Sequence, residues 1–367
     1  MKISILGPAY PFRGGIAYHT SLLAHHLNER GEEVQFLTYT RQYPKILYGR
    51  DDKDPGSNPV GIRAEQILDS INPVSWIRTA NAIVDFNPAV VYIPWWIPFW
   101  APVWRTITAV VKRKRPQTQI VFLCHNVLPH EKHWYDVGAL KMGVGQADLF
   151  IAHSPAEQKK IKHFFPHIPV VYTPHPTYKM LGSSHDDGDS KSPYFLFAGL
   201  VRYYKGVDVL IEAFAKIAKQ NVSYSLIIAG EFWDDAAQYH SMVKRLNIED
   251  RVEIIDRYLA NDELAMLIEQ AAAVVLPYRS TTQSGMAQLA LGKGTPIIST
   301  RLDGIQTTVT QDKNGLLVEP GDKSALANAL ARYIDDGLEV AFRQNIQQSN
   351  PAYTWDELCR LVRTPNQ

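Results

Sequence analysis

The sequence has few cysteines, no charge tract and no long apolar run. Cys124 and Cys359 are the only cysteines among 367 residues. They cannot form a disulfide framework and match no metal-ligand spacing, so a reducing cytoplasm is expected. No run reaches the roughly 18 apolar residues of a membrane span, and the apolar start at residues 1–7 is too short for a signal peptide. The 38 Lys and Arg residues balance 37 Asp and Glu residues. A nucleic-acid partner is therefore not expected, because a phosphate backbone requires a broad cationic surface.

Short apolar segments instead alternate with helical patterns along the chain, which favours parallel sheets of α/β type. The expected strands of the first half are residues 2–6, 34–38, 89–93, 119–123, 148–153 and 170–173. Those of the second half are residues 194–198, 225–229, 252–255, 274–276, 296–299 and 315–318. Two doubly wound halves imply a cleft, since ligands bind outside the carboxyl ends of parallel strands.

A polar stretch at residues 182–193 cannot contribute to a core and marks the domain boundary. We expect an N-terminal domain at residues 1–181, this linker, a C-terminal domain at residues 194–350 and a final helical segment at residues 351–367. A chain of this length exceeds one usual core, which agrees with two domains.

The second half opens with a pattern that is typical of a phosphate site. The strand Tyr194–Ala198 ends at Gly199, and Arg202 and Lys205 stand at the turn into a helix over residues 207–219. Arg can donate two parallel hydrogen bonds to phosphate oxygens, Lys adds a point charge, and the helix N-terminus adds free N–H groups. The alternative is a pair of solvated surface cations.

An aromatic segment at residues 90–104 contains Trp95, Trp96, Trp100 and Trp104 and is interrupted by three prolines. The prolines exclude a regular spanning helix. We expect a buried strand that leads into an aromatic-lined loop. The alternative is peripheral attachment to an anionic membrane, in which exposed tryptophans act beside the cations of residues 112–115.

Several motifs together resemble one known family. In the C-terminal half, Gly199 with Arg202 and Lys205, the Ala-Gly-Glu that ends at Glu231, and the Leu-Pro-Tyr at residues 276–278 are similar to the donor-binding half of retaining glycosyltransferases of family 4. The same half also contains Thr-Gln-Ser-Gly, Gly-Thr-Pro and a closing Gly-Leu-Leu-Val-Glu-Pro-Gly-Asp. Matching N-terminal motifs are residues 7–16 and 125–131. The resemblance implies the GT-B fold, in which two Rossmann-like domains with doubly wound parallel sheets face a central cleft.

The resemblance also implies transfer of a sugar from a nucleotide-sugar donor with retention of anomeric configuration. The residues implied to hold the donor diphosphate are Arg202, Lys205, Gly14, Gly15, Ser284, Gly285 and Met286. Positioned cations can offset charge on a departing phosphate, so no metal or other cofactor is expected. Taken alone, the Gly14-Gly15 pair could equally be a tight turn that caps a helix.

Three further groups are implied to contact the sugar. His125, at a strand end, is expected to approach the donor sugar and the reacting centre as the catalytic residue. Glu231, Gln283 and Glu131 are expected to bind sugar hydroxyls. A strand-end histidine can also be purely structural, and the glutamates could be helix-cap or surface residues.

The chain departs from the family at one motif. Many members carry two glutamates eight positions apart ahead of Gly-x-Pro, where this chain has Thr281 and Leu289. The Thr-Gln-Ser-Gly form resembles a subgroup without that pair, so ribose recognition is not transferred. Asp-x-Asp spacings at residues 52–54 and 187–189 lie in polar loops, and the twelve histidines form no metal-ligand set by spacing.

The sequence therefore predicts a cytoplasmic glycosyltransferase for glycan, polysaccharide or glycolipid synthesis, with peripheral membrane contact at the inner face as a further expectation. The partners are a nucleotide-sugar donor and a glycan or lipid-linked acceptor that enters near residues 95–104. In the family the last helix crosses back to the first domain, a part that residues 355–363 could take. Two alternatives stay open: a nucleotide-sugar epimerase and a non-catalytic nucleotide-sugar-binding scaffold.

Overall fold

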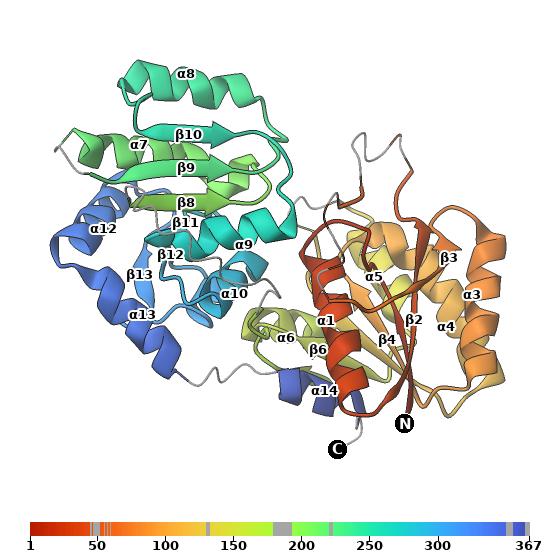
Figure 1. Ribbon diagram of the computed structural model, residues 1–367. Helices are drawn as coiled ribbons and strands as arrows, with labels where there is room; N and C mark the ends of the chain where they lie inside the picture. Colours follow the sequence, from red (N-terminus) through yellow and green to blue (C-terminus); the bar gives the residue numbers. More distant parts are fainter. Residues whose placement is uncertain are drawn as a thin grey trace. The chain divides into compact units, whose positions relative to one another are not determined.

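The computed structural model describes residues 1–44, 46, 52–54, 56, 58, 60–129, 133–178, 193–219, 223–349 and 355–363. The chain forms two compact units (Figure 1). The first unit comprises Met1–Pro176 with Tyr353–Gln367, and the second comprises Thr177–Ala352. Residues 182–192 of the expected linker lie outside the described part of the chain.

The first unit contains a parallel sheet in the order β3-β2-β1-β4-β5-β6-β7. Its strands are β1 (Lys2–Leu6), β2 (Glu33–Arg41), β3 (Glu65–Asp69), β4 (Val90–Trp95), β5 (Gln119–Cys124), β6 (Leu149–Ala152) and β7 (Val170–Tyr172). The helices of this unit are α1 (Gly15–Glu29), α3 (Pro73–Phe86), η1 (Pro98–Trp100), α4 (Ala101–Lys114), α5 (Asp136–Val144), α6 (Pro155–Phe164) and α14 (Trp355–Arg363). The strand order reverses between β1 and β4, which is where a doubly wound sheet binds ligands.

The second unit repeats this plan with the order β10-β9-β8-β11-β12-β13, again all parallel. Its strands are β8 (Tyr194–Ala198), β9 (Ser225–Ala229), β10 (Val252–Ile255), β11 (Ala273–Leu276), β12 (Ile297–Thr300) and β13 (Gly315–Val318). Its helices are η2 (Tyr203–Lys205), α7 (Val207–Ala218), α8 (Ala236–Leu246), α9 (Asn261–Gln270), α10 (Gly285–Gly292), α11 (Asp303–Gln306), α12 (Lys323–Asp335) and α13 (Leu338–Gln348). The prediction of two doubly wound parallel sheets is confirmed.

The aromatic segment is a core element. Trp95, Trp100 and Trp104 are completely buried and Trp96 is 7% exposed. The prolines fit because Pro98 and Pro102 occupy first-turn positions of η1 and α4, where no backbone N–H is needed. The prediction of a loop is therefore wrong from Pro98 onward, where η1 and α4 form. The membrane alternative is also wrong in requiring that these tryptophans be exposed. Within the described residues, no helix has the length and apolar character to cross a membrane.

The helix α14 belongs to the first unit although it follows the second unit in sequence. In Figure 1 it lies beside α1. The two helices meet through Trp355, whose ring stacks on His26 with 5.1 Å between centroids. Leu358 and Val362 of α14 are fully buried, so this helix contributes to the core of the first unit.

Candidate functional site

The turn after β8 carries Arg202 and Lys205 to the point where the strand order of the second sheet reverses. β8 pairs with β9 on one side and with β11 on the other, so the turn lies outside the carboxyl ends of β8 and β11. Gly206 allows the turn to close there. Its φ is +68°, and a Cβ would lie 2.0 Å from the carbonyl oxygen of Pro277. Only glycine fits this close approach.

Both cations at this turn lie on aromatic rings. The Arg202 guanidinium is 4.4 Å from the centroid of the Trp233 ring, and Lys205 Nζ is 3.8 Å from that of Tyr278. Both cations are half-buried. Within the described residues, neither forms an ion pair with a carboxylate. The aromatic faces hold the two charges in place without neutralising them, which suits a site for an anion.

Arg279 holds the backbone of this turn. It binds Asp208 with two hydrogen bonds of 2.8 and 2.7 Å, and the same guanidinium donates to the carbonyl oxygen of Tyr203 at 2.7 Å. Its backbone N–H donates to the carbonyl oxygen of Tyr204 at 2.8 Å. Burial raises the pKa of Asp208, but the hydrogen bonds and charge of Arg279 outweigh it and hold that pKa below its ordinary value. Arg279 is thus a structural cation, whose charge is paired with Asp208.

The N-terminus of α10 lies beside the same turn. Ser284 caps the helix by accepting the N–H of Ala287 at 3.2 Å, and Gly285 and Met286 are the first helical residues. Met286 Cε lies 3.8 Å from the position that a Cβ of Gly199 would take. The first N–H groups of a helix have no partner within the helix. The structure therefore brings together Arg202, Lys205 and the predicted Ser-Gly-Met segment at one edge.

Two of the three predicted sugar-binding residues lie in the described part of the chain. Glu231 follows β9, and its Oε2 accepts the indole N–H of Trp233 at 3.4 Å. Trp233 also supports Arg202, so Glu231 shares a neighbour with the cationic turn. Gln283 directly precedes the Ser284 cap. Glu131 lies outside the described residues.

In the first unit, the glycine pair opens α1 as predicted. Gly14 is the N-cap with a φ of +102°, and Gly15 is the first helical residue. A Cβ at either position would meet no atom within 4 Å. The backbone angle, and not crowding by the protein, therefore requires glycine at Gly14, and the space beside the pair stays open to a ligand.

His125 follows β5 and lies in a buried cluster of imidazoles. Its ring centroid is 5.1 Å from that of His19 and 6.1 Å from that of His153. Burial and the nearby His175 lower the pKa of His125 to about 3. Burial likewise lowers the pKa of His175 to about 4 and those of His19 and His153 well below the ordinary value. These rings are therefore neutral near pH 7. At that pH His125 can donate or accept hydrogen bonds but carries no positive charge.

Sequence reasoning missed two features of these edges. Arg279 is a single cation after Leu-Pro-Tyr, and only the fold shows that it reaches Asp208. The imidazoles of His19, His153 and His175 come together although no spacing along the chain links them. The usable signal was that His153 ends one expected strand and His175 follows another, because the carboxyl ends of parallel strands meet at one edge.

Two doubly wound parallel sheets in one chain are typical of the two-domain α/β proteins called GT-B. Residues 13–173 match the family model described as Glycosyltransferase Family 4, and residues 192–336 match the one described as Glycosyl transferases group 1. Together the two matches span most of the chain. The N-terminal part of the chain thus matches the glycosyltransferase family 4 model, and the C-terminal part matches the glycosyl transferases group 1 model.

Curated relatives share part of the sequence. A D-inositol 3-phosphate glycosyltransferase 1 from Catenulispora acidiphila is 28% identical over 238 residues, which are 58% of this chain and 56% of that protein. A D-inositol 3-phosphate glycosyltransferase from Xylanimonas cellulosilytica is 27% identical over 169 residues, 45% of this chain and 40% of that protein. The chain spans about half the length of the curated relatives it matches.

Solved structures share the fold over the whole chain. Sucrose-phosphate synthase from Thermosynechococcus elongatus has a TM-score of 0.72 at 19% identity, covering 100% of this chain and 98% of that one. Anabaena Alr3699/HepE in complex with UDP has a TM-score of 0.72 at 16% identity, covering 100% and 99%. These likenesses establish the GT-B fold.

Proposed function

We propose that this protein transfers a sugar from a nucleoside diphosphate sugar to an acceptor with retention of anomeric configuration. The observation that carries the proposal is the pair Arg202 and Lys205. Both are half-buried at the reversal point of the second sheet, beside the N-terminus of α10, and have no carboxylate partner among the described residues. A bound diphosphate would neutralise the two positive charges.

In this proposal the diphosphate binds Arg202, Lys205, the N–H groups at Gly285 and Met286, and the hydroxyl of Ser284. Because Gly14 and Gly15 have no Cβ, the backbone at these residues can approach a phosphate of the donor closely. As the β-phosphate departs with its bonding electrons, the two cations stabilise the growing negative charge, so the diphosphate itself needs no metal. Glu231, Gln283 and Glu131 bind sugar hydroxyls, and neutral His125 serves the reacting centre through hydrogen bonds.

The comparisons support the donor class. Anabaena Alr3699/HepE has been solved with UDP and with UDP-glucose, and the curated relatives are named glycosyltransferases. The epimerase and scaffold alternatives are not favoured. The acceptor we propose is a glycan or lipid-linked molecule, and the product a glycan, polysaccharide or glycolipid.

A cytoplasmic location with contact at the inner membrane face is also part of the proposal. Because the tryptophans are buried, this contact would depend on the cations at the end of α4. Arg113 and Lys114 are exposed there, whereas Lys112 pairs with Asp148 at 2.6 Å. Such a contact would weaken with rising salt.

The test is turnover with a panel of UDP-, GDP- and ADP-sugars. We expect one donor to raise the melting temperature and to release its nucleoside diphosphate, with nuclear magnetic resonance showing retained configuration in the product. A protein that binds a donor yet neither hydrolyses nor transfers it would be a scaffold, and an inverted product would refute retention.

A further inference from the structure

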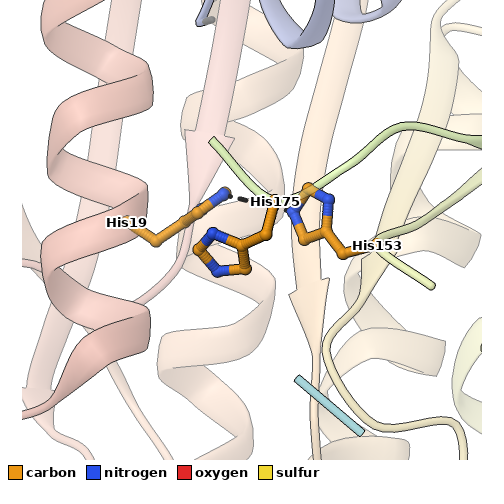
Figure 2. A group of neighbouring side chains, drawn as sticks. All are labelled: His19, His153 and His175. Carbon is orange, nitrogen blue, oxygen red and sulfur yellow. Dashed lines mark hydrogen bonds between the residues drawn. The ribbon is translucent and has the colours of Figure 1, made fainter. Parts of the chain in front are cut away.

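The histidine cluster of the first unit contains a group that the proposed reaction does not use. His19 comes from α1, His153 directly follows β6, and His175 follows β7. One ring nitrogen from each lies within 4.8 Å of those from the other two. Figure 2 shows the three rings reaching one another from separate segments. Their exposed fractions are 0, 2 and 6%, so three polar rings meet in the interior.

Backbone carbonyls orient two of the three rings. His153 Nδ1 lies 2.8 Å from the carbonyl oxygen of Thr173, and His175 Nδ1 lies 3.0 Å from that of Pro176. A carbonyl oxygen only accepts, so each Nδ1 carries the hydrogen and each Nε2 keeps a lone pair. Metal-binding histidines are typically held in this way, with the second ring nitrogen donating to a carbonyl or carboxylate.

The spacing of one pair of nitrogens fits a metal ion. His19 Nε2 and His153 Nε2 are 3.4 Å apart. Two nitrogens bound to zinc at about 2.0–2.1 Å and at the tetrahedral angle lie about 3.4 Å apart. A hydrogen bond from His19 to His153 could also account for this pair. His175 contributes the third nitrogen of the group, so a metal ion would be shared by all three rings.

We propose that His19, His153 and His175 bind one zinc ion through three imidazole nitrogens, with water as the fourth ligand. Imidazole favours zinc over magnesium or calcium, which prefer oxygen ligands. The bound ion ties α1 to the segments after β6 and β7 and so stabilises the first unit. This proposal goes beyond glycosyl transfer and does not depend on it.

The first experiment measures zinc in the full-length protein. The chain is expressed in zinc-supplemented medium, and a chelator-treated sample is also refolded with Zn²⁺, because the buried ligands can capture metal during folding. We expect one tightly held zinc per chain by elemental analysis and a melting temperature that falls after chelation. Absence of zinc from both preparations would overturn the proposal.

Variants locate the ion. His175→Ala and His153→Ala should lose the zinc, whereas His167→Gln, which changes an exposed histidine of the same unit, should keep it. The group His25, His26 and Glu29, in which both histidines are half-buried and Glu29 is exposed, is a competing site. His25→Gln breaks that group, so loss of zinc in this variant would assign the metal to the surface and overturn the proposal.

A spectroscopic variant keeps the test decisive if the alanine variants do not fold. Cysteine can replace a histidine as a zinc or cobalt ligand. With Co²⁺ as the probe, the unchanged chain should show the visible bands of a four-coordinate site, and His175→Cys should add a thiolate-to-cobalt charge-transfer band. A folded, cobalt-loaded His175→Cys protein without that band would show that position 175 is not a ligand.

Discussion

The carboxyl edges of the two sheets have the same topology but opposite chemistry. At the first sheet the side chains are neutral imidazoles buried among one another and beside Trp355. At the second sheet they are the half-buried cations Arg202 and Lys205 on aromatic faces. Doubly wound sheets place whatever follows their strands at one edge, and the residue types decide which ligand that edge can accept. In our proposals the second edge binds a diphosphate through its cations, and the imidazoles of the first edge bind a metal ion.

The largest effect should come from removing both cations of the second edge. Arg202→Ala combined with Lys205→Ala should weaken binding of the donor nucleoside diphosphate by about 1,000-fold, since each charged hydrogen-bonding group contributes about 1.5–3 kcal/mol. Isothermal titration calorimetry measures this. Lys244→Ala, which changes an exposed cation of the same unit, is the control. Unchanged affinity in the double variant would refute the assignment.

The geometry of the turn gives the next effect. In Gly206→Ala the new Cβ would overlap the carbonyl oxygen of Pro277, so we expect a loss of more than about 3 kcal/mol in the free energy of unfolding. Gly321→Ala has a similar φ of +79° but meets no atom within 4 Å. It should cost only about 1–2 kcal/mol of backbone strain. Urea unfolding compares the two, and equal losses would show that the turn can move away from β11.

A third change separates binding from turnover. His125→Ala should lower kcat by about 100-fold, the usual effect of losing one hydrogen-bonding group at a reacting centre, while donor affinity stays nearly constant. Steady-state kinetics and nucleotide titration measure the two quantities, with His167→Gln as the control. If kcat and affinity were both unchanged, His125 would be a structural residue of the first edge.

The smallest effect concerns pH. The folded-state pKa of Asp208 is lowered, so its pairing with Arg279 stabilises the protein above the ordinary pKa and loses that effect as the pH falls through the folded value. Because the pair is partly exposed, Asp208→Asn should cost about 1 kcal/mol at pH 7 and progressively less below about pH 4. Unfolding of both proteins across this range measures the difference. Asp312→Asn, in a more exposed pair with Arg332, is the control and should change little.

Most strands could be predicted because they are short apolar runs bounded by polar residues. The segments Ser225–Ala229 and Val252–Ile255 agree with their predicted bounds for this reason. Strand β3 was missed, since its sequence Glu-Gln-Ile-Leu-Asp has a single fully buried residue and it forms the edge of the sheet. The aromatic segment was misjudged because prolines usually break helices, whereas here they begin them.

The candidate sites were predictable only in part. Arg202 and Lys205 follow a recognisable strand within a few residues. Their positions along the sequence were therefore sufficient to place both at one turn. The imidazoles at positions 19, 153 and 175 are distant in sequence, and only the parallel sheet brings them together. The role of Arg279 depends on a partner 71 residues away, a distance over which local patterns carry no information.

The return of α14 to the first unit has a consequence for biosynthesis. Thr177–Ala352 is inserted between two parts of the first unit, so a ribosome completes the second unit before it has made all of the first. Until residues 355–363 emerge from the ribosome, the surface of α1 that contacts Trp355 stays exposed to solvent. Folding in the cell should therefore not follow the order of the sequence. The second unit can fold completely before the first unit, which still lacks α14.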